Sequence, residues 1–216
     1  MIDALLFIAA ALSSYVLGSV PFGYIAAKAN GVDIRSVGSG NIGATNVFRS
    51  ISKGWGLFTF ACDFLKGLLP VILFSFLAVR LGFTGAIDGL KLVCAMGAIA
   101  GHNWPVFLHF KGGKGVATSA GALLGIAPAA VGFGVVVWVL AFLVFRYVSL
   151  ASMLAALTIA VGAWIMGPVR SGSSMLTPVV LSLMALMIVV RHRANIQRLL
   201  SGTENRFSFK KKGKAE

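Results

Sequence analysis

The chain of 216 residues is rich in apolar side chains and poor in charge. Hydrophobic residues make up 58% of it and charged residues only 12%, whereas a soluble domain carries about 45–50% apolar and about 25% charged residues. Because so few charges cannot cover a compact globule with solvated side chains, the composition excludes a soluble enzyme. In a membrane protein, the net charge of +13 indicates basic cytoplasmic loops and anionic partners, such as anionic membrane lipid, and not nucleic acid.

Apolar runs separated by polar breaks predict an all-α, polytopic helical membrane protein. A helix needs about 20 residues to span a bilayer, and the chain offers seven candidate runs: 4–27, 55–79, 87–107, 116–127, 129–146, 149–167 and 176–190. The fourth run has only twelve residues, which reach about 18 Å as a helix. It therefore borrows flanking residues, forms a half-helix or joins the fifth run.

The distribution of basic residues predicts which side of the membrane each loop faces. Loops after the first, third, fifth and seventh runs carry fifteen of the nineteen Lys and Arg residues, and the opposite loops carry only Arg80 and Arg170. Cytoplasmic loops hold the excess of Lys and Arg. We therefore expect seven transmembrane helices, with the N-terminus outside and the C-terminus cytoplasmic. Residues 1–206 are expected to form a single transmembrane domain, and residues 207–216 a basic cytoplasmic tail that adsorbs to anionic lipid.

The first polar segment covers residues 38–49 and contains three glycines. Glycine has no side chain, so the backbone of such a loop can approach a ligand closely. Successive backbone amides can form an anion-binding nest, and an arginine can bind a phosphate with two parallel hydrogen bonds. An ordinary polar connector is the alternative interpretation. The candidate ligands in this segment are Ser39, Asn41, Thr45, Asn46 and Arg49.

The second polar segment covers residues 101–118 and includes a Lys-Gly-Gly-Lys-Gly turn before an expected helix start. Helix N-termini attract phosphate through their free amides and the helix dipole. The turn is not a Walker A loop, which would need Ser or Thr at position 115. A basic anchor at the membrane surface is the alternative. The candidate substrate-binding residues are Gly112, Gly113, Lys114 and Gly115.

The third segment, residues 191–204, combines basic residues with His192, Asn195 and Glu204. On a helix His192 and Asn195 share a face, and histidine is the natural proton acceptor near neutral pH. A surface anchor is the alternative for His192. Glu204, surrounded by basic residues, is expected to order them by ion pairing and to have a structural role.

Two further pairs stand out from the apolar runs. Asp63 and Lys66 lie three residues apart, so on a helix they would neutralise each other; intramembrane ionisable pairs are costly and often functional. We weigh a structural role for Asp63 and a substrate-binding role for Lys66. Ser149 and Ser152 are further candidate substrate-binding residues, with simple helix packing as the alternative. No metal site or cofactor is predicted, since the sequence has no His-Glu-x-x-His motif and no carboxylate cluster for a metal. A His-x-x-x-x-Asp catalytic dyad is also missing.

Together, the three segments resemble the acyl-phosphate:glycerol-3-phosphate acyltransferase family, PlsY, of bacterial inner membranes. The resemblance extends from about residue 18 to residue 204. It implies transfer of a fatty acyl group from acyl-phosphate to the 1-hydroxyl of sn-glycerol 3-phosphate, giving lysophosphatidic acid and phosphate in phospholipid biosynthesis. It also implies a multi-pass protein that functions as a monomer, with a cytoplasmic active site. Ser39, Arg49, His192 and Asn195 would be essential, residues 112–115 would form the glycerol-phosphate pocket, and Glu204 would be structural.

The residues themselves are compatible with this chemistry. Acyl-phosphate is already activated, so positioning and charge stabilisation can supply most of the catalysis. The proton would go to His192 or to a substrate phosphate oxygen. Two alternatives remain at this stage: an organic-anion transporter that uses the same basic site, and a non-catalytic scaffold with a basic tail.

Overall fold

The computed structural model describes residues 2–167 and 174–208, so Arg170 and residues 209–216 lie outside the described part of the chain. The regular elements in these ranges are all helical. The long helices are α1 (Ile2–Ser19), α4 (Lys53–Arg80), α5 (Ile87–Asn103), α7 (Pro128–Phe145), α8 (Val148–Met166) and α10 (Leu176–Arg191). The short ones are α2 (Phe22–Ala29), α3 (Ala44–Ser50), the 3-10 turn η1 (Val106–Leu108), α6 (Val116–Leu124) and α11 (Arg193–Leu200).

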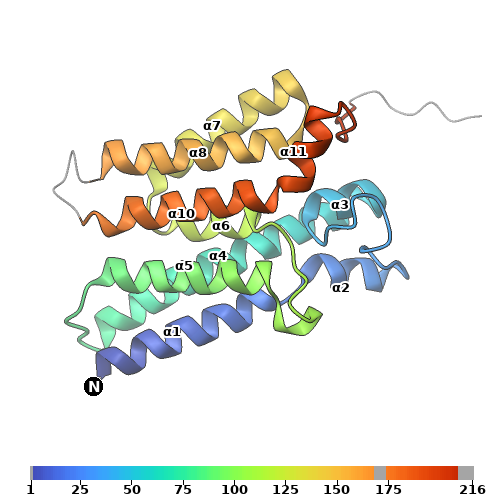
Figure 1. Cartoon of the computed structure of the whole chain (residues 1–216). Coiled ribbons are helices and arrows are strands. Elements are labelled where there is room, and N and C mark those ends of the chain that lie inside the picture. Colours follow the sequence, from blue (N-terminus) through green and yellow to red (C-terminus); the bar gives the residue numbers. More distant parts are fainter. Residues whose placement is uncertain (1, 168–173, 209–216) are drawn as a thin grey trace, which may run out of the picture.

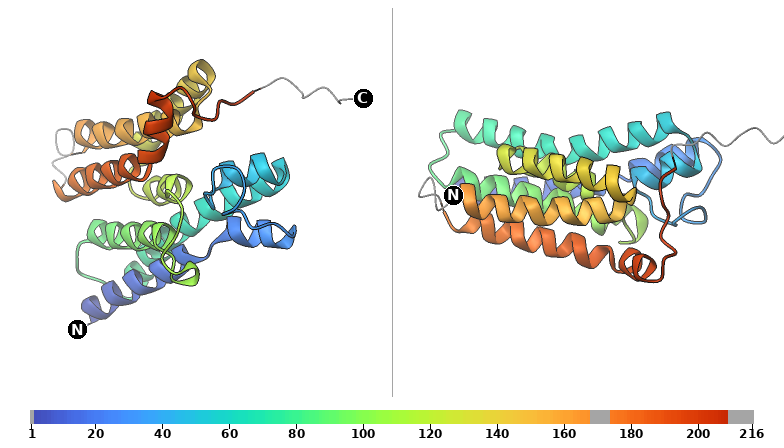
Figure 2. Two further views of the ribbon diagram at one scale, coloured as in Figure 1. Left: turned by 45° about the vertical axis from the view of Figure 1, so that its right-hand side comes forward. Right: turned by 90° about the horizontal axis from the view of Figure 1, so that it is seen from above.

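The long helices form two groups that lie side by side (Figures 1 and 2). Helices α1, α4 and α5 pack together in one group, and α7, α8 and α10 pack together in the other. The short helix α6 packs against α4 and α5 and also touches α7, so it joins the groups. The apolar core runs through both groups along this contact. Lipid-facing side chains on the outer surfaces stay exposed, as a membrane protein requires.

The helices follow the expected apolar runs, with two refinements. The first run is broken at Val20–Pro21 into α1 and α2, because proline lacks the amide that would continue the helix. The fourth run becomes the nine-residue helix α6, which is about 14 Å long. It is therefore a half-helix, and α7 begins separately at Pro128.

Several helices are long and apolar enough to cross a membrane, which confirms the polytopic helical class. By length and composition, the described residues contain four such segments, at residues 3–29, 53–80, 128–145 and 148–166. Helices α10 and α11, bent by 56° relative to each other, make a fifth if the pair is one span. Helix α5 has 17 residues and is therefore one residue shorter than the 18 required of such a segment.

The polar segments meet at one end of the molecule. The ribbons place α2, α3, α11 and the loops beside them at this end, while the start of α1 and the α4–α5 loop lie at the other end (Figure 1). The alternating direction of the long helices produces this arrangement. It brings residues far apart in sequence to a common site.

Glycines allow α6 to lie directly against α4. A Cβ atom on Gly121 would lie 2.0 Å from the carbonyl oxygen of Phe64, and one on Gly67 would lie 2.1 Å from that of Thr118. Any larger residue would push the two helices apart. Because the Lys-Gly-Gly-Lys-Gly turn leads directly into α6, this close contact fixes the position of that turn over α4.

Candidate active site

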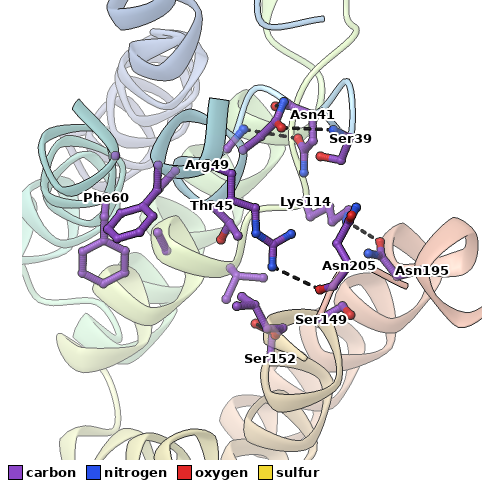
Figure 3. A pocket seen from close by; sticks show the side chains of 18 of the residues that line it. Ser39, Asn41, Thr45, Arg49, Phe60, Lys114, Ser149, Ser152, Asn195 and Asn205 are labelled. Atoms are coloured by element: carbon purple, nitrogen blue, oxygen red, sulfur yellow. Dashed lines mark hydrogen bonds between the residues drawn. The ribbon is translucent and has the colours of Figure 1, made fainter. Parts of the chain in front are cut away.

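A pocket of about 400 Å³ opens between the two helix groups, at the end where the polar segments meet. Thirteen of the residues singled out in the sequence line it. Figure 3 shows that their side chains reach the cavity from different elements. They are Ser39, Asn41, Thr45, Asn46, Arg49, Asp63, Lys114, Gly115, Ser149, Ser152, His192, Asn195 and Glu204. Lys66, Gly112 and Gly113 are not among the lining residues.

Asn46 organises the first segment. Its buried amide nitrogen donates hydrogen bonds to the carbonyl oxygens of Asn41 (2.9 Å) and Val37 (3.0 Å), and its amide oxygen accepts one from the backbone N–H of Ser39 (3.0 Å). These bonds use the amide's donors and acceptor inside the loop. Asn46 therefore shapes the segment, while Ser39 and Arg49 are left to face the cavity (Figure 3).

Arg191 fastens the second segment to the end of α10. Its guanidinium donates hydrogen bonds to the carbonyl oxygens of Gly112 (3.1 Å) and Gly113 (2.5 Å). The N–H of Gly113 in turn donates to the carbonyl oxygen of His102 (3.1 Å). A side chain at Gly113 would meet the His102 ring, with Nε2 2.1 Å from the added Cβ. Because Arg191 and His102 bind their backbone, Gly112 and Gly113 lie outside the lining of the cavity. Lys114, the next residue, lines the cavity.

Lys114 and Asn195 connect the second and third segments. The Lys114 ammonium donates a hydrogen bond to the side-chain oxygen of Asn195, and Figure 3 shows the two side chains meeting from opposite sides. Burial lowers the pKa of Lys114 from its usual 10.5 to about 8, with Arg198 and Arg191 adding to the effect and Glu204 opposing it. The amine is therefore a cation at neutral pH that loses its proton in mildly alkaline solution.

Glu204 links α8 to α11 through hydrogen bonds, one of them to Asn195. Its carboxylate accepts hydrogen bonds from Ser149 Oγ (2.8 Å), Asn195 Nδ2 (2.6 Å) and Arg198 Nε (2.7 Å). Burial alone would raise the pKa of Glu204, but these three donors outweigh it and the pKa lies below the usual value. Glu204 therefore stays ionised at neutral pH and holds Asn195 in position.

The His192 ring is held in one tautomer. Its side chain is buried, and Nδ1 lies 2.8 Å from the carbonyl oxygen of Ile188. A carbonyl oxygen can only accept a hydrogen bond, so Nδ1 carries the proton and Nε2 of the neutral ring has a free lone pair. His192 lines the cavity, and so its ring is suited to accept a proton there.

Asp63 and Lys66 form a buried ion pair at the base of the pocket. Lys66 Nζ lies 2.6 Å from Asp63 Oδ1 and also donates to the carbonyl oxygen of Val20 (2.9 Å). That carbonyl belongs to the break between α1 and α2. With its ammonium used in this way, Lys66 lies outside the cavity, whereas Asp63 lines it.

The charges around the pocket are unbalanced in favour of cations. The lining carboxylates are Asp63 and Glu204, and each is ion-paired, the first with Lys66 and the second with Arg198. Arg49 and Lys114 also reach the cavity, and no ion pair is formed by either of them among the described residues. Two unmatched cations and a glycine-rich backbone favour a phosphorylated ligand.

One wall of the pocket is apolar, and sequence reasoning did not find it. It consists of Leu57 and Phe60 of α4 and of Trp138 and Phe142 of α7, which all line the cavity. Trp138 Nε1 donates to Ser152 Oγ (3.2 Å), so this serine orients the wall. No sequence signal separates these residues from ordinary lipid-facing ones. The described residues contain no group of three His, Cys, Asp or Glu side chains that could hold a metal ion.

The fold and the pocket define a helical membrane protein whose site suits an amphipathic, phosphorylated ligand. Residues 8–202 match the family described as "Glycerol-3-phosphate acyltransferase", and the chain belongs to this family. It is 44% identical to the glycerol-3-phosphate acyltransferase of Desulforudis audaxviator, over 92% of this chain and 94% of that one. It is 42% identical to that of Aquifex aeolicus, over 90% and 95% of the two chains.

Solved structures agree in fold. The chain is similar to the crystal structure of PlsY, an integral membrane glycerol 3-phosphate acyltransferase, in its glycerol 3-phosphate form, with a TM-score of 0.83, 39% identity and coverage of 94% and 96% of the two chains. The lysophosphatidic acid form gives a TM-score of 0.79 at 38% identity. The resemblance noted in the sequence is thereby confirmed. The protein is a membrane-embedded glycerol-3-phosphate acyltransferase of phospholipid biosynthesis, and neither a transporter nor a scaffold is supported.

Proposed function

We propose that acyl transfer takes place in the pocket between the two helix groups, with acyl-phosphate as donor and the 1-hydroxyl of sn-glycerol 3-phosphate as acceptor. The observation that carries this proposal is the pairing of two unmatched cations, Arg49 and Lys114, with an apolar wall in one cavity. Acyl-phosphate needs both features at once. Its head group is an anion, and its chain requires a hydrophobic path.

The two phosphate groups have separate places in this proposal. Glycerol 3-phosphate binds by its phosphate to Lys114 and the Gly115 amide at the start of α6, in the pocket shaped by Gly112 and Gly113. The acyl-phosphate head binds to Arg49 and Ser39, which also line the cavity. Its chain then lies along Phe60 and its neighbours toward the membrane. The binding roles of the other polar lining residues, Asn41, Thr45, Asn46, Ser149 and Ser152, are chiefly to hold these groups in place.

The reaction is a direct displacement. The glycerol 1-hydroxyl oxygen attacks the acyl carbon, the bond from that carbon to the phosphate oxygen breaks, and inorganic phosphate leaves with the electron pair. The hydroxyl proton passes to His192 Nε2 or to a phosphate oxygen of a substrate. Asn195, held by Glu204 and Lys114, orients the acceptor. Positioning and fixed positive charge supply most of the rate acceleration.

A substitution of His192 separates the two proton acceptors. If His192 is the base, His192→Gln lowers kcat by about 10²–10⁴-fold with a nearly unchanged KM, because general-base catalysis contributes that much. If a substrate phosphate takes the proton, kcat falls by less than about tenfold. Turnover at the wild-type rate would exclude His192 as the base.

The membrane topology is part of the proposal. The chain crosses the bacterial inner membrane seven times, with α6 as a partial pass, the N-terminus outside and the C-terminus cytoplasmic. The grouping of basic loops at the pocket end supports a cytoplasmic active site, since cytoplasmic loops carry the excess of Lys and Arg. In this proposal the protein functions as a monomer. The lysines of the tail, at positions 210–212 and 214, contact anionic lipid.

The decisive experiment follows two products at once. Purified protein is given glycerol 3-phosphate and either acyl-phosphate or acyl-coenzyme A, and phosphate and lysophosphatidic acid are measured. We expect product only with acyl-phosphate, and a loss of at least about 100-fold in Arg49→Ala, because removing a charged hydrogen-bond partner of the reacting group costs about 3 kcal/mol. Product formation from acyl-coenzyme A alone would contradict the proposed donor.

A further inference from the structure

The chain after α11 crosses the mouth of the pocket. The backbone N–H of Phe207 donates a hydrogen bond to the carbonyl oxygen of Arg146 (2.8 Å), at the end of α7. The Phe207 ring lies 5.8 Å from the ring of Phe48 on α3 and 5.4 Å from that of Phe142 on α7, measured between centroids. Phe207 thus bridges the two helix groups at a place where it also lines the cavity.

The same segment also contacts the Arg49 side chain through Asn205 and Phe207. Arg49 Nη2 donates to the carbonyl oxygen of Asn205 (3.2 Å), a bond visible in Figure 3. The Arg49 guanidinium carbon also lies 5.3 Å from the centre of the Phe207 ring, within cation–π range. The segment therefore covers the cation that we assign to the acyl-phosphate head group.

Phe207 continues the apolar wall up to the polar rim. The Phe142 ring stacks on Trp138 with a centroid distance of 5.1 Å, so Phe48, Phe207, Phe142 and Trp138 form an unbroken row of rings. Three of these rings stand on helices. Phe207 stands on an irregular segment, and its ring contacts one ring on α3 and one on α7.

We propose that Phe207 determines which nucleophile attacks the acyl donor, by excluding water from the acyl carbon. This inference rests on the proposed use of acyl-phosphate. Water and the glycerol 1-hydroxyl are both oxygen nucleophiles, and an activated donor reacts with either. Attack by water forms a bond to the acyl carbon, breaks its bond to the phosphate oxygen, and yields a fatty acid and phosphate. Closing a site against water prevents such a side reaction.

The position of Phe207 explains how this selection would work. Glycerol 3-phosphate is held deeper in the pocket by Lys114, whereas water can reach the acyl carbon from the mouth. A ring packed between Phe48 and Phe142, above Arg49, blocks that approach without touching the acceptor site. Its loss would open the mouth while leaving Lys114 and Asn195 in place.

The test measures phosphate released per lysophosphatidic acid formed in the presence of glycerol 3-phosphate, and the rate of phosphate release by hydrolysis in its absence. We expect a ratio close to one for the wild type, at least about threefold higher for Phe207→Ala, and intermediate for Phe207→Leu, which keeps part of the bulk. Phe133→Ala is the matched control: this phenylalanine lies on α7 and is 60% exposed, so its loss should leave the ratio unchanged.

Two outcomes would overturn the proposal. A fall in turnover with an unchanged ratio in Phe207→Ala would show a merely structural role. A change only in the KM for acyl-phosphate would show an entrance for the donor and not a barrier to water. Phe207→Leu decides the question if Phe207→Ala does not fold. Wild-type protein that forms no lysophosphatidic acid from acyl-phosphate would contradict the proposed donor itself, independently of Phe207.

Discussion

Lys114 is the pocket residue whose charge depends most directly on pH. Its pKa is lowered to about 8, chiefly by burial, so raising the pH through that value converts the ammonium to a neutral amine. Substrate phosphate, with a second pKa of about 6, stays doubly charged over this range. We therefore expect the KM for glycerol 3-phosphate to rise several-fold between about pH 7 and pH 9.5, as measured by initial rates in detergent or vesicles.

Lys114→Arg is the matched control for this prediction. A guanidinium keeps its charge throughout the range, so the variant should have a KM that varies little with pH, even if its value at neutral pH is higher. The assignment of Lys114 to the glycerol phosphate would be contradicted by an equal alkaline rise in both proteins, or by a flat profile in the wild type.

At the residue scale, the sequence indicates polar site residues well and apolar ones poorly. Arg49, Lys114 and Asn195 are conspicuous because polar groups are costly in a chain of this hydropathy, and the structure places all three around one cavity. Phe142 and Phe207 line the same cavity. In a membrane protein, however, a phenylalanine that faces a pocket has the same sequence signature as one that faces lipid.

The contact between α4 and α6 gives a prediction about an element. Gly121→Ala places a methyl group against the carbonyl oxygen of Phe64, where a Cβ would lie only 2.0 Å away. Helix α6 must move, and the phosphate-binding turn before it moves too. A misplacement of about 1 Å can cost about 100-fold in rate, so we expect kcat/KM to fall by one to two orders of magnitude.

Gly132 on α7 provides the control for this substitution. A Cβ there would have no atom within 4 Å, so Gly132→Ala should retain activity. It should also raise the apparent melting temperature slightly, because alanine favours a helix by about 0.5–1 kcal/mol over glycine. Equal activity in the Gly121 and Gly132 variants would show that the position of α6 does not control catalysis.

Glu204 is expected to link α8 and α11 through its three hydrogen bonds. Glu204→Gln removes the charge that attracts Asn195, Ser149 and Arg198, and charged hydrogen bonds contribute about 1.5–3 kcal/mol. We expect a lower apparent melting temperature at pH 7, measured in detergent. Because the folded-state pKa is lowered, the stabilisation is present above the unfolded-state pKa of about 4.3 and is lost as the pH falls.

The pH dependence distinguishes this role from simple packing. The difference in melting temperature between the wild type and Glu204→Gln should shrink as the pH falls through and below about 4.3, where the wild-type carboxyl also becomes neutral. A difference that persists unchanged in acid would mean that the charge of Glu204 does not provide the stabilisation.

At the element scale, hydropathy predicts where helices lie but not how they are interrupted. The long helices coincide with apolar runs, because a run of this length in lipid must satisfy its backbone internally. At the break at Val20–Pro21, the free Val20 carbonyl oxygen accepts a hydrogen bond from the Lys66 ammonium on another helix. Such a long-range partner is not visible in a local pattern, and neither is the exact length of α6.

At the scale of the whole molecule, function depends on two helix groups that meet at one end. The pocket takes its glycine-rich loops from the group containing α4 and α5, and Ser149, His192 and Glu204 from the segment that begins with α7. From the distribution of Lys and Arg alone, the sequence indicates that the basic loops lie on the same side of the membrane. It does not indicate how the groups dock, because helices in lipid associate by close packing and interhelical hydrogen bonds, without a hydrophobic driving force between them.

Labelling of single cysteines tests this arrangement in the membrane. In a variant lacking Cys62 and Cys94, cysteine replaces Ser36, Ser201 or Thr84, all exposed. Ser36 lies just before the first segment and Ser201 just after α11, both at the pocket end. Thr84 lies in the α4–α5 loop at the other end (Figure 1). With a membrane-impermeant thiol reagent on intact cells whose outer membrane is permeabilised, we expect labelling at position 84 only.

Lysis should then expose positions 36 and 201 equally, since both belong to the cytoplasmic end. The acyltransferase activity of each variant serves as the control for correct folding. Labelling of positions 36 and 201 from intact cells, with position 84 protected, would place the pocket on the outer side. Labelling of only one of the two would place the glycine-rich segment and α11 on opposite sides of the bilayer, and no common pocket could then exist.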